Sequence, residues 1–231
     1  MIRRVIDRVR RTAGRAPGRI AMRLGRISKA TPLSTNWGFD RGEPVDRFYI
    51  ANFLAAHADD IRGHVLEVAE DLYSSRFGGG HVTRLDIVSL HPTPIATITG
   101  DLTHPATLPA GQFDCIICTQ TLQLLFDLRA AVENLRRALR PGGVLLLTAP
   151  GITPIDRGQW KESWYWSFTK ASLRRLLSQA FDPEKIEVSV YGSLTAATGF
   201  LHGAAVEDIG AGKLQKFDAA YPVIVAARAV A

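Results

Sequence analysis

Short apolar runs that alternate with amphipathic helical patterns constrain the fold of this chain more than any other feature. The run Val144 to Thr148 is the clearest, since it follows Pro141-Gly-Gly143, where a helical pattern ends. That pattern has apolar residues at Leu128, Ala131, Val132, Leu135 and Leu139. An unbroken apolar strand is typical of a parallel sheet that is covered on both faces. The order of elements therefore predicts an α/β fold.

Further apolar runs predict the remaining elements. We expect strands over residues 65–69, 82–88, 95–99, 113–118, 186–191 and 222–229, and helices that begin at Pro44, Asp127 and Thr169 and over residues 193–209. The alternation predicts a doubly wound, seven-stranded and mostly parallel sheet. Only 12 residues separate the first two strands and six separate the second from the third. Because parallel strands normally need a dozen or more residues to cross over, these crossovers are expected to be shortened.

The charge divides the chain into two parts. Residues 1–30 hold nine Arg and one Lys against Asp7, a charge of +9, so residues 31–231 carry −3 of the net +6. Residues 1–30 are predicted to be a basic N-terminal extension, either amphipathic or disordered, that could contact an anionic membrane. Residues 31–231 are predicted to be a single domain. Its acidic charge argues against a nucleic-acid partner.

The composition also bears on compartment and on metal binding. No run approaches the roughly 18 apolar residues of a transmembrane helix, and no apolar segment follows the Arg-rich start as in a secretory signal. Cys115 and Cys118 are the two cysteines. Their spacing on a strand directs them to opposite faces, so we expect core residues and no metal site. The expectation is a cytoplasmic protein, peripheral to a membrane at most through residues 1–30.

Candidate ligand-binding residues stand at the predicted strand ends, where open parallel sheets bind ligands. These ends present Glu67, Ala69, Asp86, Asp101, Leu102, Thr119 and Gln120. Glu67 and Asp86 are 19 residues apart, close to the ~20 that separate a phosphate or nucleoside loop from a ribose-binding acid.

These runs, in this order, resemble the class I S-adenosylmethionine-dependent methyltransferases over about residues 60–150. The runs are Val65 to Ala69, Asp86, Gly100 to Leu102, Leu108 to Cys118 and Leu139 to Leu147. Outside them, residues 37–50 and 200–203 look like a subgroup found alongside sugar and polysaccharide biosynthesis enzymes. The resemblance implies a Rossmann-like fold, S-adenosylmethionine as cofactor and O-methylation of a small molecule or sugar.

The resemblance also implies roles for individual residues. Asp86 would accept hydrogen bonds from the ribose hydroxyls. Asp101 would accept from the adenine amino group, and the Leu102 backbone N–H would bond to a ring nitrogen. Thr119 and Gln120 would flank the methionine part of the cofactor.

The loop after the first strand departs from the family pattern. The family places glycines there, whereas this chain has Ala69-Glu-Asp-Leu-Tyr-Ser74. Glu70 and Asp71 would repel the methionine carboxylate, so Arg47 or Arg41 is expected to offset them. The alternative is a non-catalytic methyltransferase-like module that partners a biosynthetic enzyme.

Candidate substrate and catalytic residues lie further along the chain. Trp164 and Trp166 belong to an aromatic cluster that could wall a substrate cleft or pack beneath a lid. His202 is a candidate base, with a structural role as its alternative. A nucleic-acid methyltransferase is disfavoured by the acidic domain. A nicotinamide oxidoreductase is disfavoured because the first loop lacks G-x-G-x-x-G.

Overall fold

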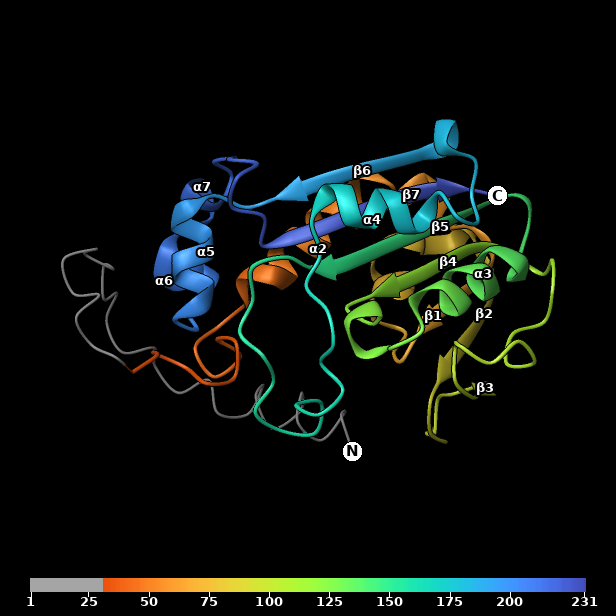
Figure 1. Cartoon of the computed structure of the whole chain (residues 1–231), viewed down its shortest axis with the longest axis horizontal. Helices are drawn as coiled ribbons and strands as arrows, with labels where there is room; N and C mark the ends of the chain where they lie inside the picture. The colour runs from red at the N-terminus through yellow and green to blue at the C-terminus, as the bar shows by residue number, and fades with distance from the viewer. Residues whose placement is uncertain (1–30) are drawn as a thin grey trace.

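The computed structural model describes residues 31–231, and the predicted extension over residues 1–30 lies outside them. A seven-stranded sheet in the order β3-β2-β1-β4-β5-β7-β6 forms its centre (Figure 1). The strands are β1 (Gly63–Val68), β2 (Val82–Ser89), β3 (Ile98–Thr99), β4 (Phe113–Thr119), β5 (Leu139–Pro150), β6 (Ile186–Tyr191) and β7 (Ile224–Val230). All neighbours pair in parallel except β7, which runs antiparallel to β5 and β6. The predicted seven-stranded, mostly parallel sheet is confirmed.

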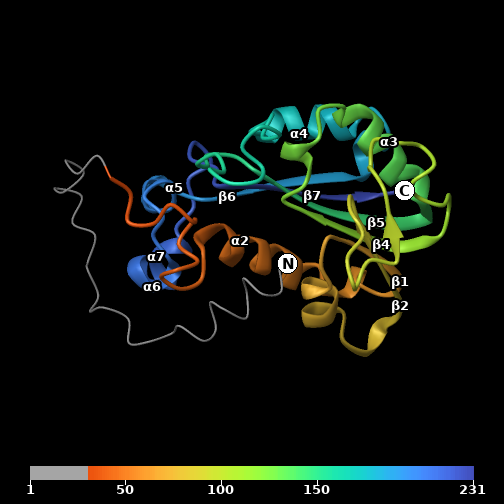
Figure 2. The ribbon, with the colours of Figure 1, turned by 90° about the horizontal axis from the view of Figure 1, so that it is seen from below.

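Helices cover both faces of the sheet (Figure 2). One face packs α3 (Leu128–Ala138) and α4 (Lys170–Leu177), and the other packs α2 (Val45–Ala56). Beyond one end of the sheet lie α5 (Leu194–Leu201), α6 (Val206–Ile209) and α7 (Ala211–Leu214). Within residues 31–231, no helix is long and apolar enough to cross a membrane.

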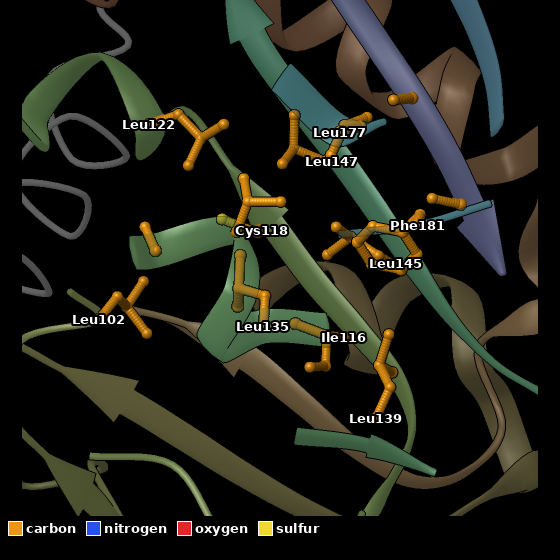
Figure 3. Packing of buried hydrophobic residues seen from close by; sticks show 14 of the residues in the cluster. Leu102, Ile116, Cys118, Leu122, Leu135, Leu139, Leu145, Leu147, Leu177 and Phe181 are labelled. Carbon is orange, nitrogen blue, oxygen red and sulfur yellow. The ribbon is translucent and has the colours of Figure 1, made fainter. Parts of the chain in front are cut away.

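Each face of the sheet buries its own apolar cluster. Figure 3 shows Cys118 packed among Ile116, Leu135 and Leu145 on the side of α3. Cys115 belongs to the cluster on the side of α2. Both thiols are free, and burial raises the pKa of Cys118 to about 12. The prediction that the two cysteines are core residues on opposite faces is confirmed.

Some boundaries differ from the sequence-based expectation. The helix expected over residues 193–209 breaks after Leu201, because Gly203 adopts a φ of +70° with Ser34 O only 2.2 Å from where a Cβ would lie. The third strand is shorter than expected, and β5 begins at Leu139, where it pairs with Phe113. The connection from β1 to β2 holds only short helical turns at Ser74–Gly78 and Gly79–His81.

Candidate functional site

The loop after β1 is organised by a buried carboxylate. Glu67 is 2% exposed, and its two oxygens accept hydrogen bonds from the backbone N–H groups of Tyr73 (2.9 Å) and Ser74 (2.8 Å). Burial raises the pKa of Glu67, and the bonds from Ser74 and Tyr73 oppose that rise. Glu67 therefore holds the loop in its conformation, and both of its carboxylate oxygens already accept hydrogen bonds.

Replacing Glu67 by alanine should be strongly destabilising, since two buried N–H groups lose their acceptor. We expect the free energy of unfolding to fall by about 2–4 kcal/mol. Chemical denaturation measures this change. The control is Glu133→Ala, which breaks only an exposed pair with Arg129 and should cost less than about 0.5 kcal/mol. Equal effects of the two substitutions would contradict this account of Glu67.

Unusual backbone conformations mark the carboxyl edge of the sheet. In residues 31–231, the non-glycine residues with positive φ are Trp37 (49°), Ala69 (73°) and Gln120 (47°). Ala69 and Gln120 directly follow β1 and β4. Such conformations are costly for residues with a Cβ and concentrate at functional sites. Ala69 thus has the left-handed conformation that favours glycine, although its side chain is a methyl group.

Asp86 does not stand at the end of its strand, contrary to the prediction. β2 continues to Ser89, and Val88 pairs with Val68 at the end of β1. The Asp86 carboxylate lies 2.5 Å from His64 Nε2 and 3.2 Å from Arg84 Nη2. Asp86 therefore lies three residues before the end of β2, and its carboxylate is already paired with His64 and Arg84. This argues for a structural role instead of ribose binding.

The Asp86 pair has a definite pH dependence. Burial alone would raise the pKa of Asp86, but hydrogen bonds from His64 and Thr97 and the charge of Arg84 hold it below its ordinary value. Its contribution to stability is thus present above the unfolded pKa of about 4 and is lost as the pH falls through the lowered value. Asp86→Asn should cost about 1–3 kcal/mol at pH 7 in denaturation. If it instead weakened S-adenosylmethionine binding without destabilising the fold, the ribose-binding role would be restored.

Asp101 and Leu102 follow β3 as predicted, next to an open hollow lined by residues of the segment 99–107 other than Leu102. Asp101 is exposed, and its Oδ1 accepts from Thr103 N at 2.8 Å. Leu102 is buried, and its carbonyl accepts from Asn134 Nδ2 at 2.9 Å. Of the two residues predicted to contact adenine, Asp101 alone therefore lines the hollow.

A second hollow, a cavity of about 160 Å³, lies beyond the ends of β4 and β5. Its walls include residues from α2, from the β4 end and from the loop after β5. The wall residues are Trp37, Phe39, Asp46, Arg47, Gln120, Gln123, Leu124, Pro150, Thr153, Trp160, Trp164, Phe200, Val223 and Ile224. Of the predicted site residues, Arg47, Gln120 and Trp164 are thus brought together. Thr119 ends β4 but is not among the wall residues.

The two predicted substrate tryptophans separate. Trp164 stacks on Trp37, with ring centroids 6.1 Å apart, and lines the cavity. Trp166 is not among the wall residues. Its Nε1 donates to Leu125 O, and its ring contacts Phe126 at the surface. The structure thus does not bring Trp166 to the cavity, whereas Trp160 and Trp37 share the wall with Trp164.

The two candidate arginines also separate. Arg41 is bonded to the Asp208 carboxylate through Nε (2.8 Å) and Nη2 (2.7 Å). Arg47 lines the cavity, with its Nη1 3.1 Å from Asp46 Oδ2. Burial disfavours its charge, but Asp46, Tyr73 and Glu70 together raise the pKa of Arg47. Of the two arginines, Arg47 is therefore the one that lines the cavity and on which the charge of Glu70 acts.

His202 lies at the C-terminal end of α5, away from the cavity walls. Its backbone carbonyl accepts from Leu33 N (2.7 Å) and Ser34 N (3.3 Å). This placement argues against a base there. The acid in the cavity wall is Asp46, which is 8% exposed. No signal in the sequence distinguishes Asp46, because an acid in the first turn of a helix is ordinarily a dipole partner.

The sheet order, the antiparallel β7 and the hollows at the carboxyl edge define a Rossmann-like fold. Residues 60–147 match the family model described as a methyltransferase domain. The match covers less than half of the chain, and over that segment the chain is similar to methyltransferases.

A relative of known activity matches over a shorter segment. The carboxy-S-adenosyl-L-methionine synthase of Chromohalobacter salexigens is 37% identical over 81 residues, which are 34% of this chain and 29% of that enzyme. The match thus spans less than a third of the relative.

Solved structures match over most of the chain. The [4+2]-cyclase SpnF superposes with a TM-score of 0.53 at 14% identity and covers 80% of both chains. The Burkholderia thailandensis 1,6-didemethyltoxoflavin-N1-methyltransferase, with bound 1,6-didemethyltoxoflavin and S-adenosylhomocysteine, has a TM-score of 0.51 at 13% identity. It covers 79% of this chain and 76% of that one. At these identities the likeness concerns the fold alone.

Proposed function

We propose that this chain is an S-adenosylmethionine-dependent methyltransferase that methylates a hydroxyl group of a small molecule or sugar. The observation that carries the proposal is the cavity beyond β4 and β5, whose wall contains Arg47, on which the charge of Glu70 in the loop after β1 acts. A cofactor on that loop and an acceptor in the cavity would thus be neighbours. The subgroup associated with sugar and polysaccharide biosynthesis is part of this proposal.

The residues at the carboxyl edge fit S-adenosylmethionine. Ala69 is exposed in a left-handed conformation that opens the loop, and Asp101 is exposed beside an open hollow. Arg47 would bind the methionine carboxylate and offset the charge of Glu70. Asp101 and Leu102 would hold the adenine. When bound, the cofactor supplies a methyl group that its sulfonium already activates.

The chain's own residues would supply alignment, desolvation and a base. Phe39, Trp37 and Trp164 would exclude water from the acceptor. A hydroxyl is a poor nucleophile until its proton is removed. Asp46 takes the place of His202 as our candidate base, since it is the acid of the cavity wall.

The test is transfer of a tritium-labelled methyl group from S-adenosylmethionine to neutral methyl glycosides by the full-length chain. We expect labelled glycoside that depends on the protein and survives treatment with base, because a methyl ether resists hydrolysis and a methyl ester does not. Cofactor binding without any transfer across the panel would contradict the proposed acceptor. Absence of cofactor binding would favour the non-catalytic module.

A further inference from the structure

Buried polar atoms without partners gather around the cavity. Among the side chains of residues 31–231, the buried nitrogen and oxygen atoms without a hydrogen bond are Gln120 Nε2, Gln123 Oε1, Thr148 Oγ1 and Trp164 Nε1. Three of these four belong to wall residues of the one cavity. An unsatisfied buried group costs about 1–3 kcal/mol and is rare in native proteins. Their concentration at one cavity points to a polar ligand that pairs with them.

Local hydrogen bonds fix which atoms are available. Gln123 is 2% exposed, and its Nε2 donates to the backbone carbonyl of Gln120 at 3.0 Å. Only an amide nitrogen can make that bond, so Gln123 Oε1 is the free acceptor. The same nitrogen lies 3.3 Å from Gln120 Oε1, which leaves Gln120 Nε2 as a free donor. The wall therefore offers two donors, Gln120 Nε2 and Trp164 Nε1, and one acceptor.

This set of atoms suits hydroxyl groups. A hydroxyl both donates and accepts, so one can pair with Gln123 Oε1 while another accepts from Gln120 or Trp164. A carboxylate or phosphate only accepts, and it would leave Gln123 Oε1 unpaired. In the same wall the Asp46 carboxylate is paired with the Arg47 guanidinium at 3.1 Å, so the two charges offset each other and give an anion no net attraction. The atoms thus favour a neutral ligand.

The size and the apolar walls of the cavity narrow the ligand further. A cavity of about 150 Å³ holds one benzene ring, so about 160 Å³ suits a single six-membered ring. The rings of Trp37 and Trp164 provide an apolar surface. A hydroxylated six-membered ring has C–H faces for such a surface and hydroxyls at its edge.

We infer that the cavity is the acceptor subsite for a neutral hydroxylated six-membered ring, and that Gln123, Gln120 and Trp164 select it. The inference rests on the proposed function and names its acceptor class. Gln123 and Trp164 are specificity-determining residues, because each presents an otherwise unpaired atom to the ligand.

The experiment measures binding of ring probes to the full-length chain with S-adenosylhomocysteine present. The probes are neutral methyl glycosides and the matched uronates. Saturation-transfer NMR and tryptophan fluorescence measure their binding. We expect at least one neutral glycoside to bind and its uronate to bind at least about tenfold more weakly. Gln123→Met, which keeps the size of the side chain, should lower the affinity for the neutral glycoside about tenfold.

Two further variants separate recognition from folding. Trp164→Phe keeps an aromatic ring but removes the indole N–H, and it should weaken binding several-fold. Gln215→Met on the surface is the matched control and should change nothing. Three results would each overturn the inference. The first is that no neutral glycoside binds, and the second is that uronates bind more tightly. The third is that both wall variants keep the wild-type affinity and melting temperature. Failure to bind S-adenosylhomocysteine, measured separately by calorimetry, would instead contradict the proposed function.

Discussion

Replacing Asp46 by asparagine is expected to lower kcat by about 100- to 10,000-fold, the range that general-base catalysis contributes. Asparagine keeps an oxygen for the Arg47 backbone N–H, which Asp46 Oδ1 accepts at 2.8 Å, but it cannot take a proton. The affinity for S-adenosylmethionine should change far less than kcat, since Arg47 keeps its charge for the methionine carboxylate. Single-turnover kinetics with an active acceptor, together with calorimetry for the cofactor, separates these two quantities.

The matched control for Asp46→Asn is Asp59→Asn, an exposed acid that follows the same helix. It should leave kcat unchanged. An Asp46→Asn variant that keeps more than a third of wild-type kcat would exclude Asp46 as the base. Equal losses of kcat in the two variants would point to a general charge effect.

Replacing Arg47 by alanine should weaken S-adenosylmethionine binding by about 10- to 150-fold, which is the effect of losing hydrogen bonds to a charged group. The loss has two sources: the methionine carboxylate loses its partner, and the charge of Arg47 no longer offsets that of Glu70. Arg47→Lys should also lose much of the affinity, because lysine cannot pair bidentately with a carboxylate. Isothermal titration calorimetry measures all three affinities.

Decarboxylated S-adenosylmethionine isolates the role of Arg47. The wild type should prefer the intact cofactor, and Arg47→Ala should bind both forms alike. Adding Glu70→Gln to Arg47→Ala should restore part of the affinity, since it removes the repelling carboxylate. Arg175→Ala on exposed α4 is the control. Equal binding of the two cofactor forms by the wild type would show that Arg47 does not hold the carboxylate.

The sequence predicts the central strands because the middle of each is buried on both faces and is therefore mostly apolar. It does not predict where a strand ends. The apolar residues Ile87 and Val88 follow Asp86, and only the pairing of Val88 with Val68 shows that the edge lies beyond them. Asp86 was therefore placed too close to the ligand edge.

The candidate site was predictable where it depends on strand order, and it was missed where it depends on side-chain direction. Gln120 follows β4, so the fold alone places it at the edge. Trp164 and Trp166 would share a face in a strand, but their segment is irregular, and the two side chains diverge. Gln123 gave no signal in the sequence, because its burial arises from a short helical turn after β4.

The most direct test of this account is a crystal structure of the full-length chain with S-adenosylhomocysteine. The account predicts the adenosyl group at Asp101 and Leu102, the amino-acid part on the loop at Ala69, and its carboxylate on Arg47. The sulfur should face the cavity walled by Asp46 and Gln120. A ligand bound elsewhere, or one whose sulfur faces away from that cavity, would contradict the account.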